Sequence, residues 1–537
     1  MSSSQTPSLS SPTKAYSEKR FEAVFNNQLA RRGGASLLST VFASLLILAA
    51  PSVSLAAGPD VDRPREMDSN VRPTDYNDKV FKADPTYEDK PYNAEEQIKI
   101  YGGKRNLKEP RPIIEIGQPQ YIEGPFNQSD GFKNLGNKNP FSWAFSIFGD
   151  FRSAVATNDV GNDTIAEWAN VLNLDLDLKI TSTERIHAFL KPIDQGAKVA
   201  GFRDGDDNGG NGFNGELDAG LETLFFEGDL GVIASGLTDT YQSQDLPFSF
   251  GLMPLIMQNG LWVDDAFLGA GLAFPSMNSP MLDITNMDIT LFSGFGEIDS
   301  AAITDANGTQ FNNEAMLFGA AAFIEWFEGY SEFGIGYVEG TKEVGDVDYF
   351  NITGAFTRRY GGWLSNSVRL FSAVGQDTNN RAKTADGFAL LVENSLISSK
   401  PGTYVPYGNF WIGIDRPQPL AKNNGGILRN TGITFEADGM TGFPKLDDTA
   451  NDTFGGAIGI NYLFSLDQQL VVEASTVQML EGDNQAGQAA QGAQYGIGFR
   501  YQRPITNRVI VRADGIYGIR ENANDVAGVR FEIRVKF

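Results

Sequence analysis

The last twelve residues of the chain alternate between apolar and polar side chains. The apolar set occupies every second position from Ala527 to Phe537, and charged residues or glycine fill the positions between them. Successive side chains of a β-strand point to opposite faces, so one face of this segment needs an apolar medium and the other a polar one. The pattern predicts an amphipathic strand that ends on an aromatic residue.

The same alternation recurs from residue 141 onward. In residues 172–180, leucine and isoleucine share one face, and Asp175, Asp177 and Lys179 lie on the other. Burying those charges unpaired would cost on the order of several kcal/mol each, so their face must be wet. About eighteen strands are expected, with sixteen as the alternative count. They begin near Phe141, Glu167, Glu184, Gly215, Leu246, Ala266, Leu282, Ala315, Tyr330, Val347, Trp363, Asp386, Tyr404, Thr453, Gln468, Ala493, Arg508 and Val526.

A closed ring of such strands is the only β structure that satisfies its backbone in lipid. The sequence therefore predicts an all-β fold, a transmembrane antiparallel up-and-down β-barrel formed by residues 141–537. The connections support it, because they alternate between long and short, as outer loops and periplasmic turns do. We expect Phe141–Val155 to pair with the final strand and close the ring. A phase change between Ile284 and Met287 predicts a β-bulge.

One connection, residues 227–245, should be a short periplasmic turn but is long. Its apolar residues could form a short amphipathic element that closes the lower mouth of the barrel. A misjudged pair of strands is the alternative. The long outer connection 416–452 could likewise fold inward as a constriction, with Asp438, Lys445, Asp447 and Asp448 facing the pore, or form a surface hairpin.

Two segments precede the barrel. Residues 1–57 are predicted to be a signal peptide with a long n-region, because the apolar run 37–50 follows two arginines and precedes small residues; a buried core helix is the alternative. Residues 58–140 are rich in proline and charge, which predicts an extended or disordered periplasmic segment.

The composition argues against several kinds of partner and site. A net charge of -24 argues against a nucleic-acid partner, and the absence of cysteine excludes disulfides and thiolate metal sites. The mean hydropathy of -0.24 is too polar for a bundle of membrane helices, but it suits a barrel with a wet interior.

Together these features resemble a Gram-negative outer-membrane barrel of the porin type. The strand number is similar to that of monomeric substrate-channel and alginate-export barrels and of sugar-specific porins. The terminal Arg534, Val535, Lys536 and Phe537 resemble the signal read by the barrel-insertion machinery. The resemblance covers residues 141–537 and implies an outer-membrane location, contact with membrane lipids and lipopolysaccharide, and insertion through the strand that ends at Phe537. It implies a channel but no particular solute.

Charged residues on the inward faces are candidates for a pore lining. They are Arg500, Arg508, Arg512, Arg520, Arg530, Arg534, Lys536, Asp175, Asp177, Lys179, Arg185 and His187. The arginines form a positive stripe, which would lower the barrier for carboxylates and phosphates. This predicts a channel for small hydrophilic solutes, anionic ones included. The alternative is that these arginines only hydrate the wall and pair locally.

The sequence gives weaker support to three other functions: calcium binding, catalysis and a structural role. Asp204, Asp206 and Asn208 resemble the front half of a calcium loop, but Glu216 falls one place late, so an ordinary surface loop is the alternative. No other cofactor is expected. A serine hydrolase needs a histidine, and the only one, His187, is expected to face the lumen, so no enzyme is predicted. A structural or adhesive barrel with an occluded lumen remains open.

Overall fold

A computed structural model describes most of the predicted barrel. The described residues are 112–117, 138–195, 198–205, 211–215, 217–218, 220–303, 315–340, 347–376, 383–423, 425–436, 439–464, 468–480 and 490–537. Every described residue belongs to one unit of the chain, Asn93–Phe537. The predicted signal peptide therefore lies outside the described residues, as does most of the predicted periplasmic segment.

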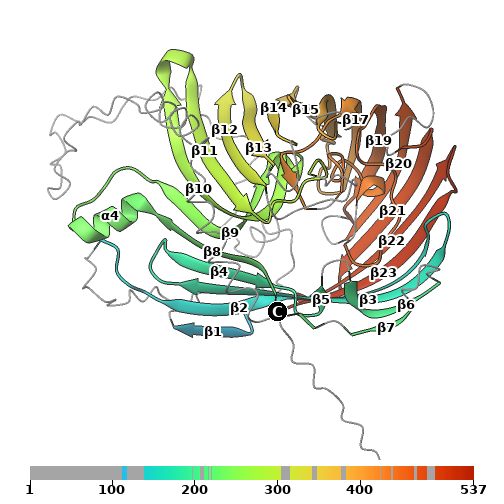
Figure 1. Cartoon of the computed structure of the whole chain (residues 1–537), viewed down its shortest axis with the longest axis horizontal. Helices are drawn as coiled ribbons and strands as arrows, with labels where there is room; N and C mark the ends of the chain where they lie inside the picture. Colours follow the sequence, from blue (N-terminus) through green and yellow to red (C-terminus); the bar gives the residue numbers. More distant parts are fainter. Residues whose placement is uncertain are drawn as a thin grey trace, which may run out of the picture. The chain divides into compact units, whose positions relative to one another are not determined.

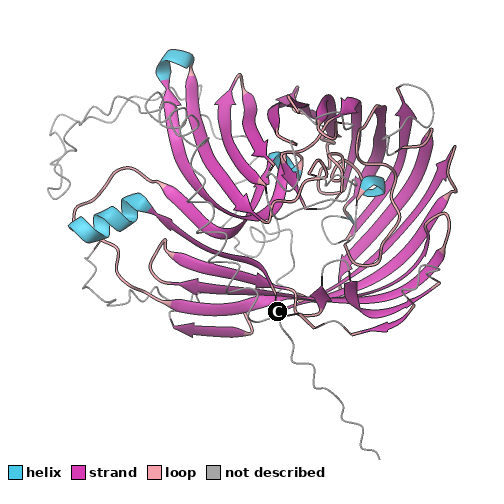
Figure 2. Cartoon of the chain, viewed as in Figure 1, coloured by secondary structure: helices cyan, strands magenta, loops and turns pink. Residues whose placement is uncertain are grey.

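Strands dominate the described chain (Figures 1 and 2), and eighteen of them form a closed antiparallel up-and-down barrel. In ring order they are β2 (Ala144–Asp159), β3 (Thr164–Lys179), β4 (Arg185–Leu190), β8 (Leu221–Asp229), β9 (Pro247–Met257), β10 (Val263–Ser279), β11 (Ile284–Gly296), β12 (Met316–Trp326), β13 (Gly329–Glu339), β14 (Tyr349–Tyr360), β15 (Leu364–Val374), β16 (Asp386–Leu396), β17 (Tyr404–Arg416), β19 (Thr453–Tyr462), β20 (Gln469–Met479), β21 (Gln494–Pro504), β22 (Val509–Arg520) and β23 (Val526–Lys536). The predicted fold class is confirmed.

The ring closes between its first and last strands, as predicted. β23 pairs antiparallel with β2 from Asp150 opposite Lys536 to Asp159 opposite Ala527. The expected bulge is also present: between β10 and β11 the register shifts, so that Met277 faces Met287 while Ser279 faces Ile284.

Two strands, β4 and β6 (Lys198–Asp204), share the edge of β3 that faces away from β2. β3 pairs with β4 along one half and, along the other, with β6, which in turn pairs with β7 (Gly212–Asn214). The short β5 (Asp194–Gln195) pairs with β6. Only β4 continues the ring, because β8 pairs with β4.

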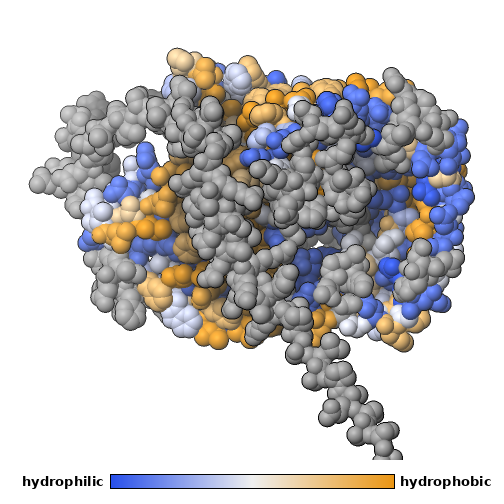
Figure 3. Space-filling view, viewed as in Figure 1, coloured by the Kyte–Doolittle hydropathy of each residue, from blue (hydrophilic) through white to orange (hydrophobic). Residues whose placement is uncertain are grey.

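The outer face of the ring is an apolar belt. On β23, Val529 is 64% exposed, whereas the neighbouring Arg530 is 1% exposed. The same contrast holds on other strands, where Ile335, Ile352, Ile458 and Ile497 are all exposed. Figure 3 shows part of this apolar surface. An exposed apolar belt around a closed barrel is the signature of a membrane-spanning barrel.

The two ends of the barrel differ in the length of their connections. Short turns such as 327–328 and 361–363 lie at the end where β23 finishes, and long connections such as 417–452 lie at the other. In bacterial barrels the short turns face the periplasm. We call these the short-turn end and the long-loop end.

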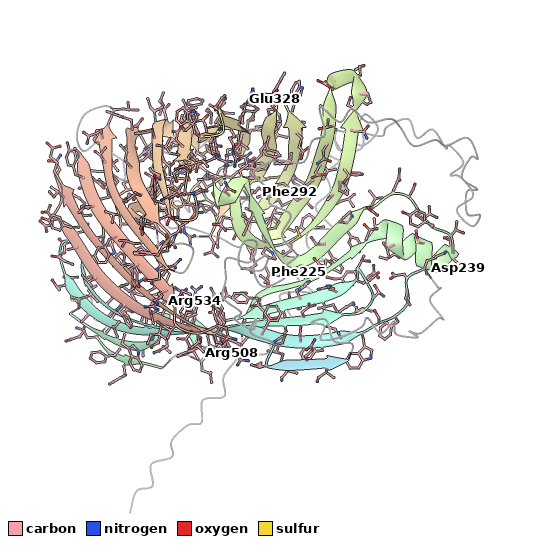
Figure 4. The ribbon with its side chains drawn as sticks, turned by 180° about the vertical axis from the view of Figure 1, so that it is seen from behind. Phe225, Asp239, Phe292, Glu328, Arg508 and Arg534 are labelled. Atoms are coloured by element: carbon pink, nitrogen blue, oxygen red, sulfur yellow. The ribbon has the colours of Figure 1, made fainter. Side chains whose placement is uncertain are left out.

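The unusually long connection at the short-turn end contains α4 (Leu230–Thr238). An amphipathic element was one of the two expectations here, and both flanking strands, β8 and β9, are present. The helix projects away from the ring, with Asp239 at its tip (Figures 1 and 4). It therefore does not close the lower mouth. Among the described residues, no helix is both long enough and apolar enough to span a membrane.

One described piece of the predicted periplasmic segment joins the barrel. β1 (Ile114–Gly117) pairs antiparallel with β2, where Ile114 faces Ile147. The adjacent part of the same edge of β2 is occupied by the chain terminus, since Gly149 and Phe537 exchange two backbone hydrogen bonds. β1 therefore covers the part of the β2 edge that lies beyond the end of β23.

Candidate functional site: the barrel interior

The interior of the ring has two walls of different chemistry. The packed wall is formed by β9 to β20, whose inward apolar side chains belong to one buried cluster. It also holds a local ionic group, in which the buried Arg369 pairs with Glu332 at 3.3 Å and with Glu393 at 2.7 Å. The charged wall is formed by the inward side chains of β21, β22, β23, β2, β3, β4 and β8. The strands are alike in pattern, so the difference comes from the residues that occupy the inward positions.

The packed wall is covered by the connection 417–452, which folds into the barrel. Leu428, Phe435 and Leu446 of this connection are buried in the apolar cluster. The ring of Phe435 stands edge-on against Trp411 of β17, with centroids 5.0 Å apart. The inward fold is therefore confirmed, but Asp448 is buried in an ion pair with Lys445 and does not face the pore, and Asp438 lies outside the described residues. We call residues 417–452 the inner loop.

A buried carboxylate fixes the middle of the inner loop. Glu473 of β20 accepts hydrogen bonds from the backbone N–H of Ile433 (3.1 Å) and of Thr434 (3.0 Å), and from the Thr434 hydroxyl (2.7 Å). The Tyr407 hydroxyl also donates to it. These donors hold η4 (Ile433–Phe435), a single 3₁₀ turn, against the wall. A buried carboxylate with this many donors is well satisfied.

The start of the inner loop is tied to β10. β18 (Ala421–Lys422) pairs in parallel with Val263 and Asp264. The Lys422 ammonium is buried and donates to the carbonyl of Gly260 at 2.8 Å. Burial lowers the pKa of Lys422 to about 8. η2 (Gln258–Gly260), another 3₁₀ turn, supplies that carbonyl.

Inward glycines make room for the inner loop. A Cβ placed on Gly336 of β13 would lie 2.5 Å from the side chain of Leu420, and one placed on Gly518 of β22 would lie 3.0 Å from that of Leu446. The inner loop thus passes over small residues on its way from the packed wall to the upper part of the charged wall.

Asp514 of β22 is the centre of the charged wall. It accepts from Arg500 at 2.7 Å, from Arg512 at 2.8 Å and from Arg530 at 2.7 Å. These residues come from β21, β22 and β23, whose register brings them together. Glu436 of the inner loop also contacts Arg500, at 2.7 Å. The predicted arginine stripe exists, but acidic groups interleave with it.

A second acidic group extends this network toward the closing seam. Glu532 of β23 pairs with Arg152 of β2 at 2.9 Å and lies 3.6 Å from Arg534. Arg534 also lies 3.7 Å from Asp150. Because each of these arginines has a carboxylate partner, local pairing offsets much of the positive charge of the stripe.

A mixed cluster lies on the charged wall at β3, β4 and β8. His187 is 2.9 Å from Glu227 and stacks on Phe225, with ring centroids 4.9 Å apart. Arg185 pairs with Asp177 at 3.1 Å. His187 and Glu227 have side chains 27% and 42% exposed, so this part of the interior is open to solvent.

The remaining predicted lining residues are dispersed. Asp175 and Lys179 lie on the inward face of β3 and are partly exposed. Arg508 and Lys536 are exposed at the short-turn end, where Figure 4 labels Arg508 and Arg534. Arg520 belongs to the long-loop end, where it donates to the carbonyl of Asn524 at 2.7 Å.

The predicted calcium loop is only partly covered. Asp204 ends β6, whereas Asp206 and Asn208 lie outside the described residues. In the part of the chain that the structure describes, no group of three or more histidine, aspartate and glutamate residues could hold a metal ion.

Several interior residues escaped the sequence prediction. Arg152 and Asp150 share the inward face of β2 with Ala154, and strand alternation alone could have identified them. Glu473 also alternates inward, but nothing in the sequence reveals its partners. Glu436 reaches the charged wall from the residue that follows η4 in the inner loop, so the alternation of the barrel strands could not have placed it there.

No protein-family model and no curated protein matches the sequence. Solved structures of Pseudomonas aeruginosa proteins are similar to the barrel. OpdL has 13% identity and a TM-score of 0.48, and the match covers 73% of this chain and 98% of OpdL. OccK5 (OpdH) has 12% identity and a TM-score of 0.47, with the same coverage of 73% and 98%. The outer membrane protein OpdK has 11% identity and a TM-score of 0.47, again over 73% and 98%.

Proposed function

We propose that this protein is an outer-membrane channel through which small hydrophilic solutes diffuse. The observation that carries the proposal is the partly exposed charged cluster of His187, Glu227 and Arg185 inside a ring whose outer face is apolar. Charges at such a place must be hydrated, because burying them without water would cost several kcal/mol each. Water and small solutes would share this space.

The proposed path follows the charged wall. The inner loop fills the space against the packed wall, where Phe435 and Leu446 are nearly inaccessible to solvent. The lower parts of β2, β3, β4, β8 and β23 carry polar groups with partial exposure, among them Asp150 and Arg534. A solute would pass between these groups and the underside of the inner loop.

The proposed selectivity is a modest preference for anions. Asp514, Glu532 and Glu436 offset most of the upper arginines, whereas Arg508 and Lys536 add exposed positive charge at the short-turn end. Positive residues at a pore mouth raise the local concentration of carboxylates and phosphates. Phospholipid, lipopolysaccharide and the insertion machinery acting on the strand that ends at Phe537 are the proposed partners, and a cleaved signal peptide is the proposed export route.

Planar-bilayer recording of the purified full chain tests conduction. We expect discrete current steps from the wild-type protein. A parallel recording of Glu473→Ala, which removes the acceptor for Ile433 and Thr434, controls for an inner loop that closes the lumen. Current only from Glu473→Ala would support the occluded structural barrel, and no current from either protein would reject the channel.

The reversal potential in a KCl gradient tests selectivity separately. A potential shifted toward that of chloride is expected. A shift toward the reversal potential of potassium would reject the anion preference but would not contradict conduction by the channel.

A further inference from the structure

Helix α4 carries its leucines and its isoleucine on the face that points away from the protein. At 100° per residue, Leu230, Ile233 and Leu237 share one side of the helix. Gly231 and Ser235 are buried on the opposite side. Leu237 is 74% exposed and Leu230 is 43% exposed. This polarity is the reverse of that of a helix that packs on a soluble core.

The local hydrogen bonds fix this orientation. Asp229 caps the helix by accepting from the backbone N–H of Val232 at 2.9 Å, and its second oxygen accepts from Leu246 at 2.8 Å. The hydroxyl of Ser235 accepts from the backbone N–H of Gln242 at 2.9 Å. The side of the helix that carries Gly231 and Ser235 is thus held against the segment between α4 and β9, so the leucines must point outward.

The helix lies at the level where the apolar belt ends. It begins directly after β8, at the short-turn end of the barrel. The other turns of this end also expose apolar groups, including Met281 of η3 (Pro280–Leu282), Phe327, Trp363 and Ile505. Figure 3 shows hydrophobic surface that continues from α4 onto the adjoining strands. The apolar face of α4 is therefore continuous with the surface that faces lipid.

We infer that α4 is an interfacial helix that lies in the headgroup region of the leaflet at the short-turn end and inserts Leu230, Ile233 and Leu237 among acyl chains. Nothing in Leu230–Thr238 is charged, and Asp229 and Asp239 flank the helix. Binding through hydrophobic contact with zwitterionic phospholipid fits this charge pattern, whereas attraction to an anionic surface does not. The inference requires that the barrel spans a membrane, but not that it conducts.

Site-directed spin labelling in phosphatidylcholine vesicles tests the inference. The chain has no cysteine, so each single-cysteine variant of the full chain carries one nitroxide. Leu237→Cys probes the apolar face, and Thr238→Cys, one residue on and exposed, is the matched control. The measured quantities are the accessibilities of each label to oxygen, which partitions into lipid, and to a water-soluble nickel chelate.

The expected result is that the label at residue 237 meets oxygen several-fold more readily than the nickel chelate, with the ratio reversed at residue 238. Ready access of the nickel chelate to both labels would place the helix in water and overturn the inference. Exclusion of both reagents from residue 237 would mean that protein covers the helix, a second copy of the chain for example, and would overturn it as well.

Discussion

The packed wall and the charged wall are built from strands of the same alternating pattern, yet their inward side chains occupy the interior of the barrel in different ways. On the packed wall, Trp411 packs against Phe435 of the inner loop, and Phe371 is buried in the same apolar cluster. On the charged wall, Asp514 and Glu532 gather arginines from neighbouring strands. Alternation determines which residues point inward, but side-chain chemistry decides whether the interior is filled or wet.

The inner loop connects the two walls. Its apolar residues pack on one, while Glu436 reaches the other and contacts Arg500. The ring of Phe443 also lies 5.4 Å from the guanidinium of Arg530. Loss of either wall should therefore affect the position of the loop, and substitutions on the two walls can separate stability from conduction.

The largest effect is expected from Asp514→Ala on the charged wall. The substitution leaves Arg530, which is 1% exposed, without its closest carboxylate. Removing one partner from a buried ionic network costs roughly 3–5 kcal/mol. Unfolding in urea, followed by the mobility of the folded barrel on gels, measures this loss. Glu328→Ala is the control, because its ion pair with Arg358 is exposed and should be worth less than about 1 kcal/mol. Equal losses from both variants would contradict the proposed role of Asp514.

Phe435→Ala is the matching test on the packed wall. Phe435 is fully buried against Trp411, and truncating a buried phenylalanine costs about 3–5 kcal/mol. Phe410, the neighbour of Trp411 on β17, points outward and is half-exposed, so Phe410→Ala should cost far less. The same urea unfolding assay compares them. A larger loss from Phe410→Ala would show that the inner loop is not packed as described.

The sequence alone predicts the ring well and its interior only in part. Alternation identifies the strands and even the bulge at Met287, because each strand carries its own period-two pattern. Pairing of Asp514 with arginines on both neighbouring strands depends on register, which hairpin geometry and not local pattern determines. In the inner loop only the short run 432–436 alternates like a strand, and it folds as the 3₁₀ turn η4, so its contact with Glu473 could not be predicted.

Glu473→Ala should release the inner loop with a smaller loss of stability. It leaves the backbone N–H groups of Ile433 and Thr434 without their acceptor, which costs about 1–3 kcal/mol, whereas the Thr434 hydroxyl keeps Ser475 as a partner. We expect faster proteolysis within residues 417–452 and a higher single-channel conductance than in the wild type. Glu473→Gln retains one acceptor oxygen and should fall between the two. Unchanged proteolysis in Glu473→Ala would mean that the apolar contacts alone hold the loop.

Neutralising an arginine of the charged wall should change selectivity modestly. Arg512→Gln leaves Asp514 with Arg500 and Arg530, so the wall loses one positive charge without losing its structure. We expect the anion-to-cation permeability ratio to fall by less than about tenfold, which corresponds to under 1.4 kcal/mol. Reversal potentials in a KCl gradient measure it. Arg358→Gln, on the exposed pair with Glu328, is the control and should leave the ratio unchanged.

The smallest expected effect is a pH dependence of how firmly the inner loop packs against the barrel wall. Burial, with the neighbouring Asp448, raises the pKa of Asp447 to about 6 from 3.8. A carboxyl whose pKa is raised in the folded state binds its proton more tightly there, so its contribution to stability is complete below about pH 3.8 and is lost as the pH rises through about 6. Proteolysis within residues 417–452 should therefore be slower at pH 5 than at pH 7.5.

Other groups of the interior also titrate, so the comparison must be made against Asp447→Asn, which cannot ionise. The difference between the two proteins in the pH dependence of proteolysis reports on Asp447 itself, provided that each rate is corrected for the activity of the protease at that pH. Asp447 lies beside Lys445 and Asp448, whose ion pair keeps the chain compact in either protein. If both proteins show the same pH dependence, the titrating groups that seat the inner loop lie on the walls and not on the loop.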